Sequence, residues 1–416
     1  MIGATPLPIR RTHAGAAARP FDLRAFDGLR GLAALYIVAH HARIDLWEGS
    51  HRALASGGFA AVLAFATVPL RYGAEVVLLF FLLSGFVIHL RQARSLARGE
   101  TPSFGALAFF RRRARRLVPP LLFALVLTAG LDAAGSRATP SLYDAYSGGR
   151  SAFAFMMNAL FLQGFAAPTF GSNSALWSLA YEAIFYALYP VLLVARVRFG
   201  ARAAFGAVFA LGAAGSAIHV AAPAIGWTIA PYFATWSLGA LVAEAFAQGA
   251  SARRPLVMLA AGGMLMMPSL VAPGALDPTL QSGIFASGLA LLMAVFVLHP
   301  AGGGVASMLA HLRGLGDRSY TLYVVHTPLL IFIAALWLRT RGSLPESGWL
   351  MPVGILGALA LAYAAARFVE LPFSERGKAR GATATAPRAR RRLVPLRLPG
   401  NAPIEREEVA DERQAA

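Results

Sequence analysis

Ten apolar runs divide this chain, and each is suited to crossing a membrane as an α-helix. They lie at residues 28–46, 74–90, 117–131, 176–195, 203–221, 228–247, 255–272, 281–299, 319–338 and 350–369. About 20 apolar residues in a helix cross a hydrocarbon core that is roughly 30 Å thick. Hydrophobic residues make up 57% of the chain and charged residues only 14%, which excludes a soluble globular protein. The sequence therefore predicts an all-α, polytopic membrane bundle of about ten transmembrane helices.

The distribution of basic residues predicts how this bundle is oriented. Cytoplasmic loops of membrane proteins are enriched in Lys and Arg. With a cytoplasmic N-terminus and ten spans, only seven of the 38 basic residues face outside: Arg43, Arg52, Arg71, Arg137, Arg150, Arg339 and Arg341. We therefore expect both termini to be cytoplasmic, and Ser147 and Ser343 to lie outside. Two shorter apolar pieces, residues 57–70 and 153–165, are expected to be re-entrant or interfacial helices.

The chain has three predicted parts. Residues 1–23 form a cytoplasmic N-terminal segment, residues 24–373 form the membrane domain, and residues 374–416 form a disordered, basic cytoplasmic tail. The first twenty residues hold no apolar run, so we expect no cleavable signal peptide. The chain has no Cys, which excludes disulfides and thiolate metal sites, and we expect no metal. The net charge of +18 is explained by topology, so we expect no nucleic-acid partner.

The first apolar run carries ionisable residues on one face. Arg30 and His41 are eleven residues apart. At about 100° and 1.5 Å per residue, both side chains leave the same face of a helix, roughly 16 Å apart along its axis. His40 points about 80° away from that face. Ionisable groups at membrane depth are costly and usually functional, although contacts to neighbouring helices would also explain them.

Further polar residues stand in or beside other runs. The segment FFRRRARRLVPP precedes and enters the third run; Arg113 and Arg116 are three residues apart in it and suit a clamp for phosphate, whereas topology anchoring is the simpler explanation. Ser84-Gly85 permits close helix packing or ligand approach. Glu182, inside the fourth run, is predicted to pair with a His at similar depth. The other candidates for the wall of a cavity are Glu75, Trp177, Ser178, Tyr323 and His326.

Five motifs occur in the order found in one known family. They are FDGLRG…HHA, FFLLSGF, RRRARRLVPP, LWSLAYEAIFYALYP and SYTLYVVHTP, and together they cover about residues 24 to 373. In this combination the chain resembles the integral-membrane acyltransferase 3 family, which includes O-acetylases of bacterial surface glycans. The family has ten residues between its Arg and its His, and this spacing selects Arg30 and His41 rather than His40. One departure concerns the acid that many members carry before the Phe-Phe pair. This chain has Leu78 and Leu79 there, with Glu75 as the nearest acid.

The resemblance implies an O-acyltransferase of the bacterial plasma (inner) membrane. It implies that His41 is the catalytic residue and that Arg113 and Arg116 serve the use of cytoplasmic acyl-CoA, with acetyl-CoA the expected donor. Glu182 matches the carboxylate after the Trp-Ser-Leu motif. The expected acceptor is a hydroxyl of a cell-envelope glycan or lipid-linked sugar, with His41 as general base. Membrane lipid is the other expected partner, and the oligomeric state is not predicted.

Two other functions fit part of the sequence. Ten spans with buried His and Glu also suit a proton-coupled secondary transporter or a glycan or lipid exporter. Against this reading, the chain shows no inverted repeat, and the Arg cluster would have no purpose. A structural membrane protein would leave the intramembrane His and Glu unexplained.

Overall fold

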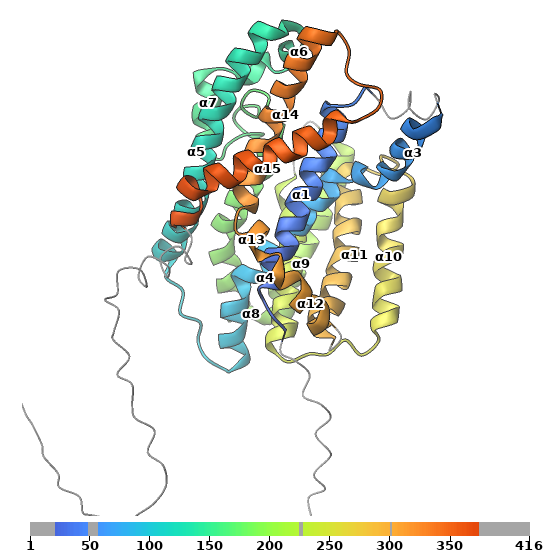
Figure 1. Cartoon of the computed structure of the whole chain (residues 1–416). Helices are drawn as coiled ribbons and strands as arrows, with labels where there is room; N and C mark the ends of the chain where they lie inside the picture. Colours follow the sequence, from blue (N-terminus) through green and yellow to red (C-terminus); the bar gives the residue numbers. More distant parts are fainter. Residues whose placement is uncertain (1–20, 49–56, 224–227, 300–301, 374–416) are drawn as a thin grey trace, which may run out of the picture.

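The computed structural model describes residues 21–48, 57–223, 228–299 and 302–373, which form a bundle of helices (Figure 1). In this part of the chain seven helices are long and apolar enough to cross a membrane. They are α4 (Gly73–Ala97), α5 (Ala106–Ala138), α8 (Trp177–Ala221), α9 (Ile229–Ala247), α11 (Pro278–Leu298), α14 (Ser319–Arg341) and α15 (Leu350–Val369). The predicted all-α membrane architecture is therefore confirmed.

Each of the ten predicted runs coincides with helix, although the number of membrane crossings stays a prediction. The first run is α1 (Ala25–Asp45) and the seventh is α10 (Pro255–Val271). Two runs fall within α8, which bends where Gly200 takes a φ of +83°. Glycine adopts such a left-handed conformation without the steric cost that a Cβ would bring. The third run was predicted too short: α5 includes the Arg-rich segment before it and continues to Ala138.

Short helices fill the connections between the long ones. They are α3 (Gly58–Ala66), η1 (Val68–Arg71), α6 (Pro140–Asp144), η2 (Ser147–Gly149), α7 (Ala152–Ala159), η3 (Ser174–Leu176), α12 (Gly302–His311), α13 (Arg313–Gly316) and η5 (Leu371–Phe373). Helices α3 and α7 have nine and eight residues. At about 1.5 Å per residue neither can cross a core of roughly 30 Å, in agreement with the interfacial prediction.

Small residues let α4 and α9 pack with their backbones in contact. A Cβ on Gly85 would lie 2.0 Å from the carbonyl oxygen of Trp236, and a Cβ on Gly239 would lie 1.9 Å from that of Leu82. Any larger residue would force the helices apart. The close approach predicted at Ser84-Gly85 is therefore confirmed, and it fixes the position of Ser84.

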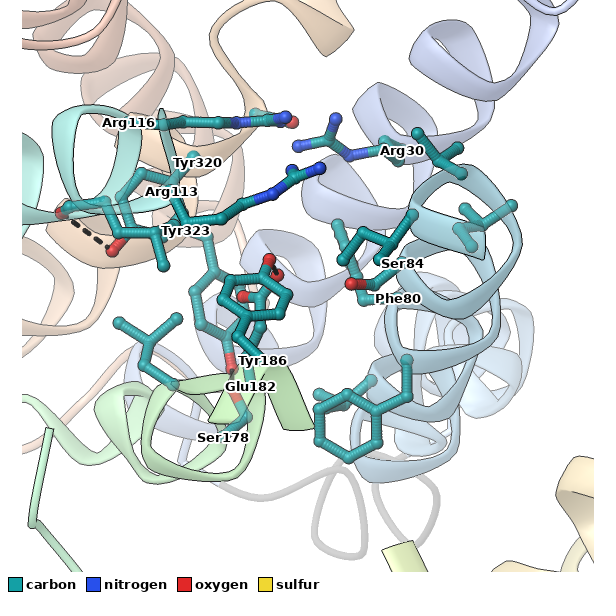
Figure 2. A pocket seen from close by; sticks show the side chains of 18 residues that line it. Arg30, Phe80, Ser84, Arg113, Arg116, Ser178, Glu182, Tyr186, Tyr320 and Tyr323 are labelled. Atoms are coloured by element: carbon teal, nitrogen blue, oxygen red, sulfur yellow. Dashed lines mark hydrogen bonds between the residues drawn. The ribbon is translucent and has the colours of Figure 1, made fainter. Parts of the chain in front are cut away.

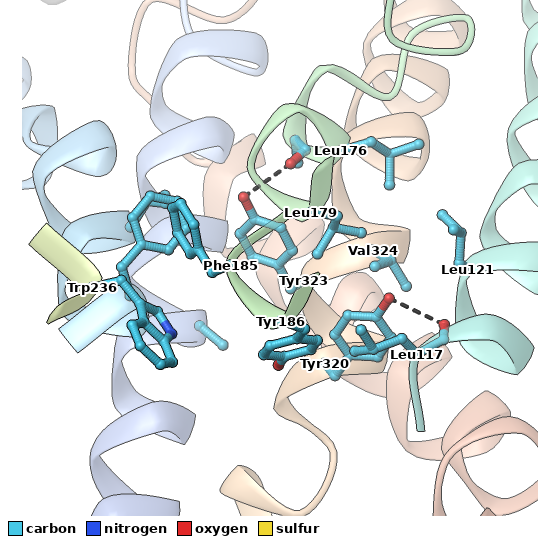
Figure 3. Packing of buried hydrophobic residues seen from close by; sticks show 14 of the residues in the cluster. Leu117, Leu121, Leu176, Leu179, Phe185, Tyr186, Trp236, Tyr320, Tyr323 and Val324 are labelled. Atoms are coloured by element: carbon cyan, nitrogen blue, oxygen red, sulfur yellow. Dashed lines mark hydrogen bonds between the residues drawn. The ribbon is translucent and has the colours of Figure 1, made fainter. Parts of the chain in front are cut away.

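Helix α14 is the most buried of the candidate spans and lies between α1, α5 and α15. Helix α15 lies obliquely across the outside of α1 and α14 (Figure 1). Around α14 the core is rich in aromatic rings, with Tyr320 and Tyr323 packed near Phe185, Tyr186 and Trp236 (Figure 3). Burial on all sides holds the polar residues of α14 in fixed positions, and these residues form part of the site.

The beginnings and ends of the helices sort to two ends of the bundle. Gly316, just before α14, packs on the backbone of Asp27 near the start of α1. Glu370 follows α15, and its carboxylate accepts hydrogen bonds from the backbone nitrogen (2.9 Å) and hydroxyl (2.6 Å) of Thr321. At the other end, the indole of Trp47 after α1 donates to the carbonyl of Glu346, between α14 and α15. The predicted end of the last span at Glu370 is confirmed, and this residue also anchors α14.

One buried polar cluster corrects a sequence interpretation. His89 stands near the end of the second apolar run, where the sequence predicts a residue at the membrane interface, but its side chain is fully buried. Its ring contacts Glu244 (2.9 Å) and the hydroxyl of Tyr189 (3.2 Å), and Arg196 donates two hydrogen bonds to the same carboxylate (2.7 and 2.9 Å). The prediction failed because the partner, Glu244, lies more than 150 residues away in α9. The cluster joins α4, α8 and α9.

The predicted tail from residue 374, and residues 1–20 of the N-terminal segment, lie outside the described residues.

Candidate active site

A pocket opens between α1, α4, α5, α8 and α14, and it gathers residues from all five sequence motifs (Figure 2). Its volume is about 80 Å³. The polar residues that line it are Arg30, Ser84, Arg113, Arg116, Ser178, Glu182, Tyr186, Ser319, Tyr320 and Tyr323. Apolar side chains form the rest of the wall, most of them from α4, among them Phe80 and Phe81, with Leu117 of α5 and Leu179 of α8. The pocket is therefore narrow, with one strongly polar side and one apolar side.

Three guanidinium groups converge in this pocket. Figure 2 shows the side chains of Arg30, Arg113 and Arg116 pointing toward one another from α1 and α5. Arg113 and Arg116 are half-buried, whereas the other three residues of the cluster, Arg111, Arg112 and Arg115, are exposed. The prediction that Arg113 and Arg116 share a helix face is confirmed. Like charges held this close favour binding of an anion.

The surroundings of Arg113 support binding of an anion in the pocket. Its guanidinium lies 5.6 Å from the ring centre of Phe109 and 5.4 Å from that of Tyr186. Its Nε is buried without a hydrogen-bond partner among the described residues. A buried donor without a partner costs about 1–3 kcal/mol. A phosphate oxygen in the pocket would remove this cost, because guanidinium groups bind phosphate with paired hydrogen bonds.

Glu182 is the one carboxylate among the described residues that line the pocket. It accepts a hydrogen bond from the hydroxyl of Tyr186, one helical turn further along α8. The predicted pair of Glu182 with His41 is wrong: these two residues form no ion pair within the described part of the chain. The two residues do not share a depth: Glu182 lines the pocket with Arg30 and is held by Tyr186, whereas His41 lies toward the other end of α1. The spacing of four residues could have revealed Tyr186, which the sequence interpretation missed.

Two serines set the shape of the pocket. The hydroxyl of Tyr323 lies 2.9 Å from the carbonyl of Ala175 and 2.7 Å from the hydroxyl of Ser178. Since a carbonyl only accepts, Tyr323 donates to it and Ser178 donates to Tyr323. On the opposite wall, Ser84 accepts from the indole of Trp236 at 3.3 Å. Ser84, Ser178 and Tyr323 therefore all line the same pocket.

The predicted catalytic histidine lies beyond the pocket, at the other end of α1. The rings of His41 and His326 are 5.1 Å apart, and those of His326 and Tyr323 are 5.8 Å apart. Tyr323 therefore connects the wall of the pocket to the histidines. Arg30 and His41 both face α14, as their shared helix face predicts. His326 is fully buried and does not itself line the pocket.

Two remaining candidates lie apart from the pocket. Trp177 packs against Phe81, Tyr181 and Tyr232, with ring centres 5.8–6.5 Å apart, and supports the pocket wall from behind. Glu75 is in the first turn of α4, near Tyr36 and Arg71. In the described ranges no three His, Cys, Asp or Glu residues come together as metal ligands would.

Comparison with known proteins agrees with this arrangement. Residues 23–367 match the sequence profile of the acyltransferase 3 family, which is described as an acyltransferase domain. The chain belongs to the acyltransferase 3 family. The matched region contains every residue that lines the pocket and the three histidines beyond it. No solved structure gives a significant match to the fold.

Two kinds of curated relative are similar to the chain. The O-acetyltransferase OatA of Staphylococcus aureus is 25% identical over 386 residues, covering 86% of this chain and 58% of the relative. The exopolysaccharide production protein ExoZ of Rhizobium meliloti is 27% identical over 322 residues, covering 75% of this chain and 93% of the relative. The chain thus spans less than two thirds of OatA and nearly all of ExoZ.

Proposed function

We propose that this acyltransferase moves an acyl group, in the first instance acetyl, from cytoplasmic acyl-CoA to a hydroxyl of a cell-envelope glycan or lipid-linked sugar. One observation carries the proposal: a pocket with three converging guanidinium groups is connected by Tyr323 to two adjacent imidazoles, those of His326 and His41. The first part suits an anionic donor and the second suits proton transfer. The family assignment supports acyl transfer.

The arginine pocket would hold the phosphate groups of coenzyme A. Arg30, Arg113 and Arg116 supply the charge, and the unpaired Nε of Arg113 supplies a free donor. Coenzyme A is long, and its pantetheine arm would extend along the apolar wall formed by α4. Arg30 and His41 are roughly 16 Å apart along α1, so an extended arm rather than direct contact must join the two regions.

His41 would act as the general base. As the acceptor oxygen attacks the thioester carbonyl, His41 takes the hydroxyl proton, and a tetrahedral intermediate forms. The carbon–sulfur bond then breaks, the ester stays on the acceptor, and the imidazolium returns its proton to the departing thiolate. The products are the acylated acceptor and free coenzyme A, and His41 ends neutral.

The class of acceptor is inferred from the relatives. One is named as an O-acetyltransferase and the other as a protein of exopolysaccharide production. Both names fit a hydroxyl of a carbohydrate as the acceptor. In the described part of the chain, no feature of the fold supports a transporter or exporter in particular. The pocket of arginines supports an acyltransferase, because it suits an anionic donor.

Transfer of label from acetyl-CoA tests the proposal. Bacterial membranes with and without the protein are supplied with acetyl-CoA labelled in the acetyl group, and envelope glycans are then isolated. We expect protein-dependent label that mild base removes as acetate, since it sits in an ester. Glycans that carry the same label with and without the protein would refute the proposed reaction.

We further propose that the protein is oriented in the bacterial inner membrane with the arginine pocket toward the cytoplasm. The chain has no Cys, so single Cys residues can be introduced at positions 99, 147 and 343 without background. We expect an impermeant thiol reagent to label positions 147 and 343 from outside and position 99 only from the cytoplasm. Labelling of position 147 solely from the cytoplasmic side would overturn this orientation.

A further inference from the structure

Three imidazoles form one cluster in the half of the bundle away from the arginine pocket. His41 lies between the other two, with its ring centre 5.1 Å from that of His40 and 5.1 Å from that of His326. Each of the three imidazoles can accept and donate a proton. They differ in the partners of their ring nitrogens, and these partners decide which nitrogen carries the proton.

Two of the three rings are committed to the backbone. Nδ1 of His40 lies 2.6 Å from the carbonyl oxygen of Leu70, and Nδ1 of His326 lies 2.7 Å from that of Tyr323. A carbonyl can only accept, so both Nδ1 atoms carry hydrogen. His326 also has its Nε2 3.2 Å from the hydroxyl of Thr327. The fold thus holds both rings in place through Nδ1.

His41 has a different partner. Its Nδ1 lies 3.8 Å from Oδ2 of Asp45, one helical turn further along α1. The two side chains are only 22% and 13% exposed. Oδ2 of Asp45 is buried and has no hydrogen-bond partner among the described residues. This carboxylate oxygen faces the one ring in the cluster whose Nδ1 is not taken by a carbonyl.

We propose that Asp45 is the positioning residue of His41, holding the Nδ1–H of the imidazole toward itself so that Nε2 is left as the base. This inference rests on the proposed function. In enzymes with a Ser-His-Asp triad, a carboxylate fixes the tautomer of the His and stabilises the imidazolium when the His takes a proton. The gap of 3.8 Å is compatible with this role, because such contacts often shorten only when substrate is bound.

The local structure can hold Asp45 in this place. The spacing of four residues puts both side chains on one face of α1. The next turn of the chain is anchored where Trp47 donates to the carbonyl of Glu346 at 2.5 Å. Tyr146, in the connection after α6, is a titratable group near Asp45. The rings of His40 and His326 lie beside His41.

Substitutions at Asp45 test the proposal. We expect Asp45→Asn to lower kcat at least about tenfold with the KM for acetyl-CoA unchanged, because the donor pocket is remote. Asp45→Glu keeps the carboxylate on a longer side chain that can close the gap, so it should recover most of the activity. Asp144→Asn removes an exposed carboxylate of α6 and serves as the matched control, with activity at the wild-type level.

The outcomes separate this inference from the proposed function. A kcat for Asp45→Asn within about twofold of wild type would overturn the role of Asp45. Equal losses in Asp45→Asn and Asp45→Glu, with both proteins accumulating normally in the membrane, would also overturn it, since charge would then be irrelevant. If His41→Ala stays active, the proposed mechanism fails whatever Asp45 does.

Discussion

Helix α1 carries two functional regions that hold their ionisable groups in opposite ways. At its start, Arg30 joins Arg113 and Arg116 in a pocket where three cations face one carboxylate. Eleven residues on, His41 lies among rings whose protons are fixed by carbonyl groups, with one carboxylate 3.8 Å away. The first region has an excess of fixed charge and suits an anion. The second is built so that one ring can gain and lose a proton.

The difference teaches that each region has its own carboxylate. Glu182 lines the pocket with the arginines, and Asp45 is the carboxylate beside His41. Binding and proton transfer are thus assigned to separate residues. Mutations of the arginines should raise the KM for acetyl-CoA, and mutations of the histidine cluster should lower kcat.

The largest effect is expected within the histidine cluster. His41→Ala should lower acyl transfer at least about a hundredfold, since alanine cannot accept the hydroxyl proton. His40→Ala should retain most activity, because its Nδ1 serves only the carbonyl of Leu70. The measurement is label transfer from acetyl-CoA in membranes with matched amounts of each protein. Equal losses in the two variants would mean that the cluster contains no single base.

A smaller effect, confined to the donor, is expected from the arginines. Arg113→Ala and Arg116→Ala should each raise the KM for acetyl-CoA about tenfold or more, since a hydrogen bond to a charged group contributes about 1.5–3 kcal/mol. Lys at either position should restore only part of the affinity, because it lacks the planar fork. Arg112→Ala is the control, as this arginine of the same segment is exposed. If a variant lacking both Arg113 and Arg116 has the wild-type KM for acetyl-CoA, the two arginines do not bind the donor. The Arg cluster would then serve only to orient the protein in the membrane.

The smallest predicted effect concerns Glu182. Glu182→Gln should reduce turnover about tenfold, equivalent to about 1.4 kcal/mol, because the hydroxyl of Tyr186 loses a charged acceptor. Its effect should add to that of Asp45→Asn, since the two carboxylates lie in different regions and share no partner. Rates of the single and double variants give the coupling. A double variant no worse than the single ones would place Glu182 and Asp45 in one catalytic unit.

Much of this arrangement could be predicted from the sequence. The spacing of Arg30 and His41 gave their shared helix face, and the resemblance to the family selected Arg113 and Arg116, the two arginines of the segment that reach the pocket. The apolar runs located the long helices to within a few residues, except at the end of α4 and the beginning of α5, where Arg-containing turns hide the helical character. These features depend on local periodicity, which a sequence displays directly.

What the sequence could not supply was the choice of partners between distant helices. His89 meets Glu244 across a tight helix crossing, and Glu370 binds the start of α14 rather than only ending α15. Asp45 was overlooked because an acid one turn after a His at a helix end is common and usually solvated. Its significance depends on its burial and on the carbonyl groups that occupy the neighbouring rings.

The central claim, that donor binding and proton transfer are separate, is tested most directly by acetyl-CoA binding to purified His41→Ala protein in detergent. We predict saturable binding with the wild-type Kd and no transfer of label to an acceptor, whereas a variant lacking both Arg113 and Arg116 should lose the binding. Loss of acetyl-CoA binding in His41→Ala, or transfer that continues without His41, would contradict the account.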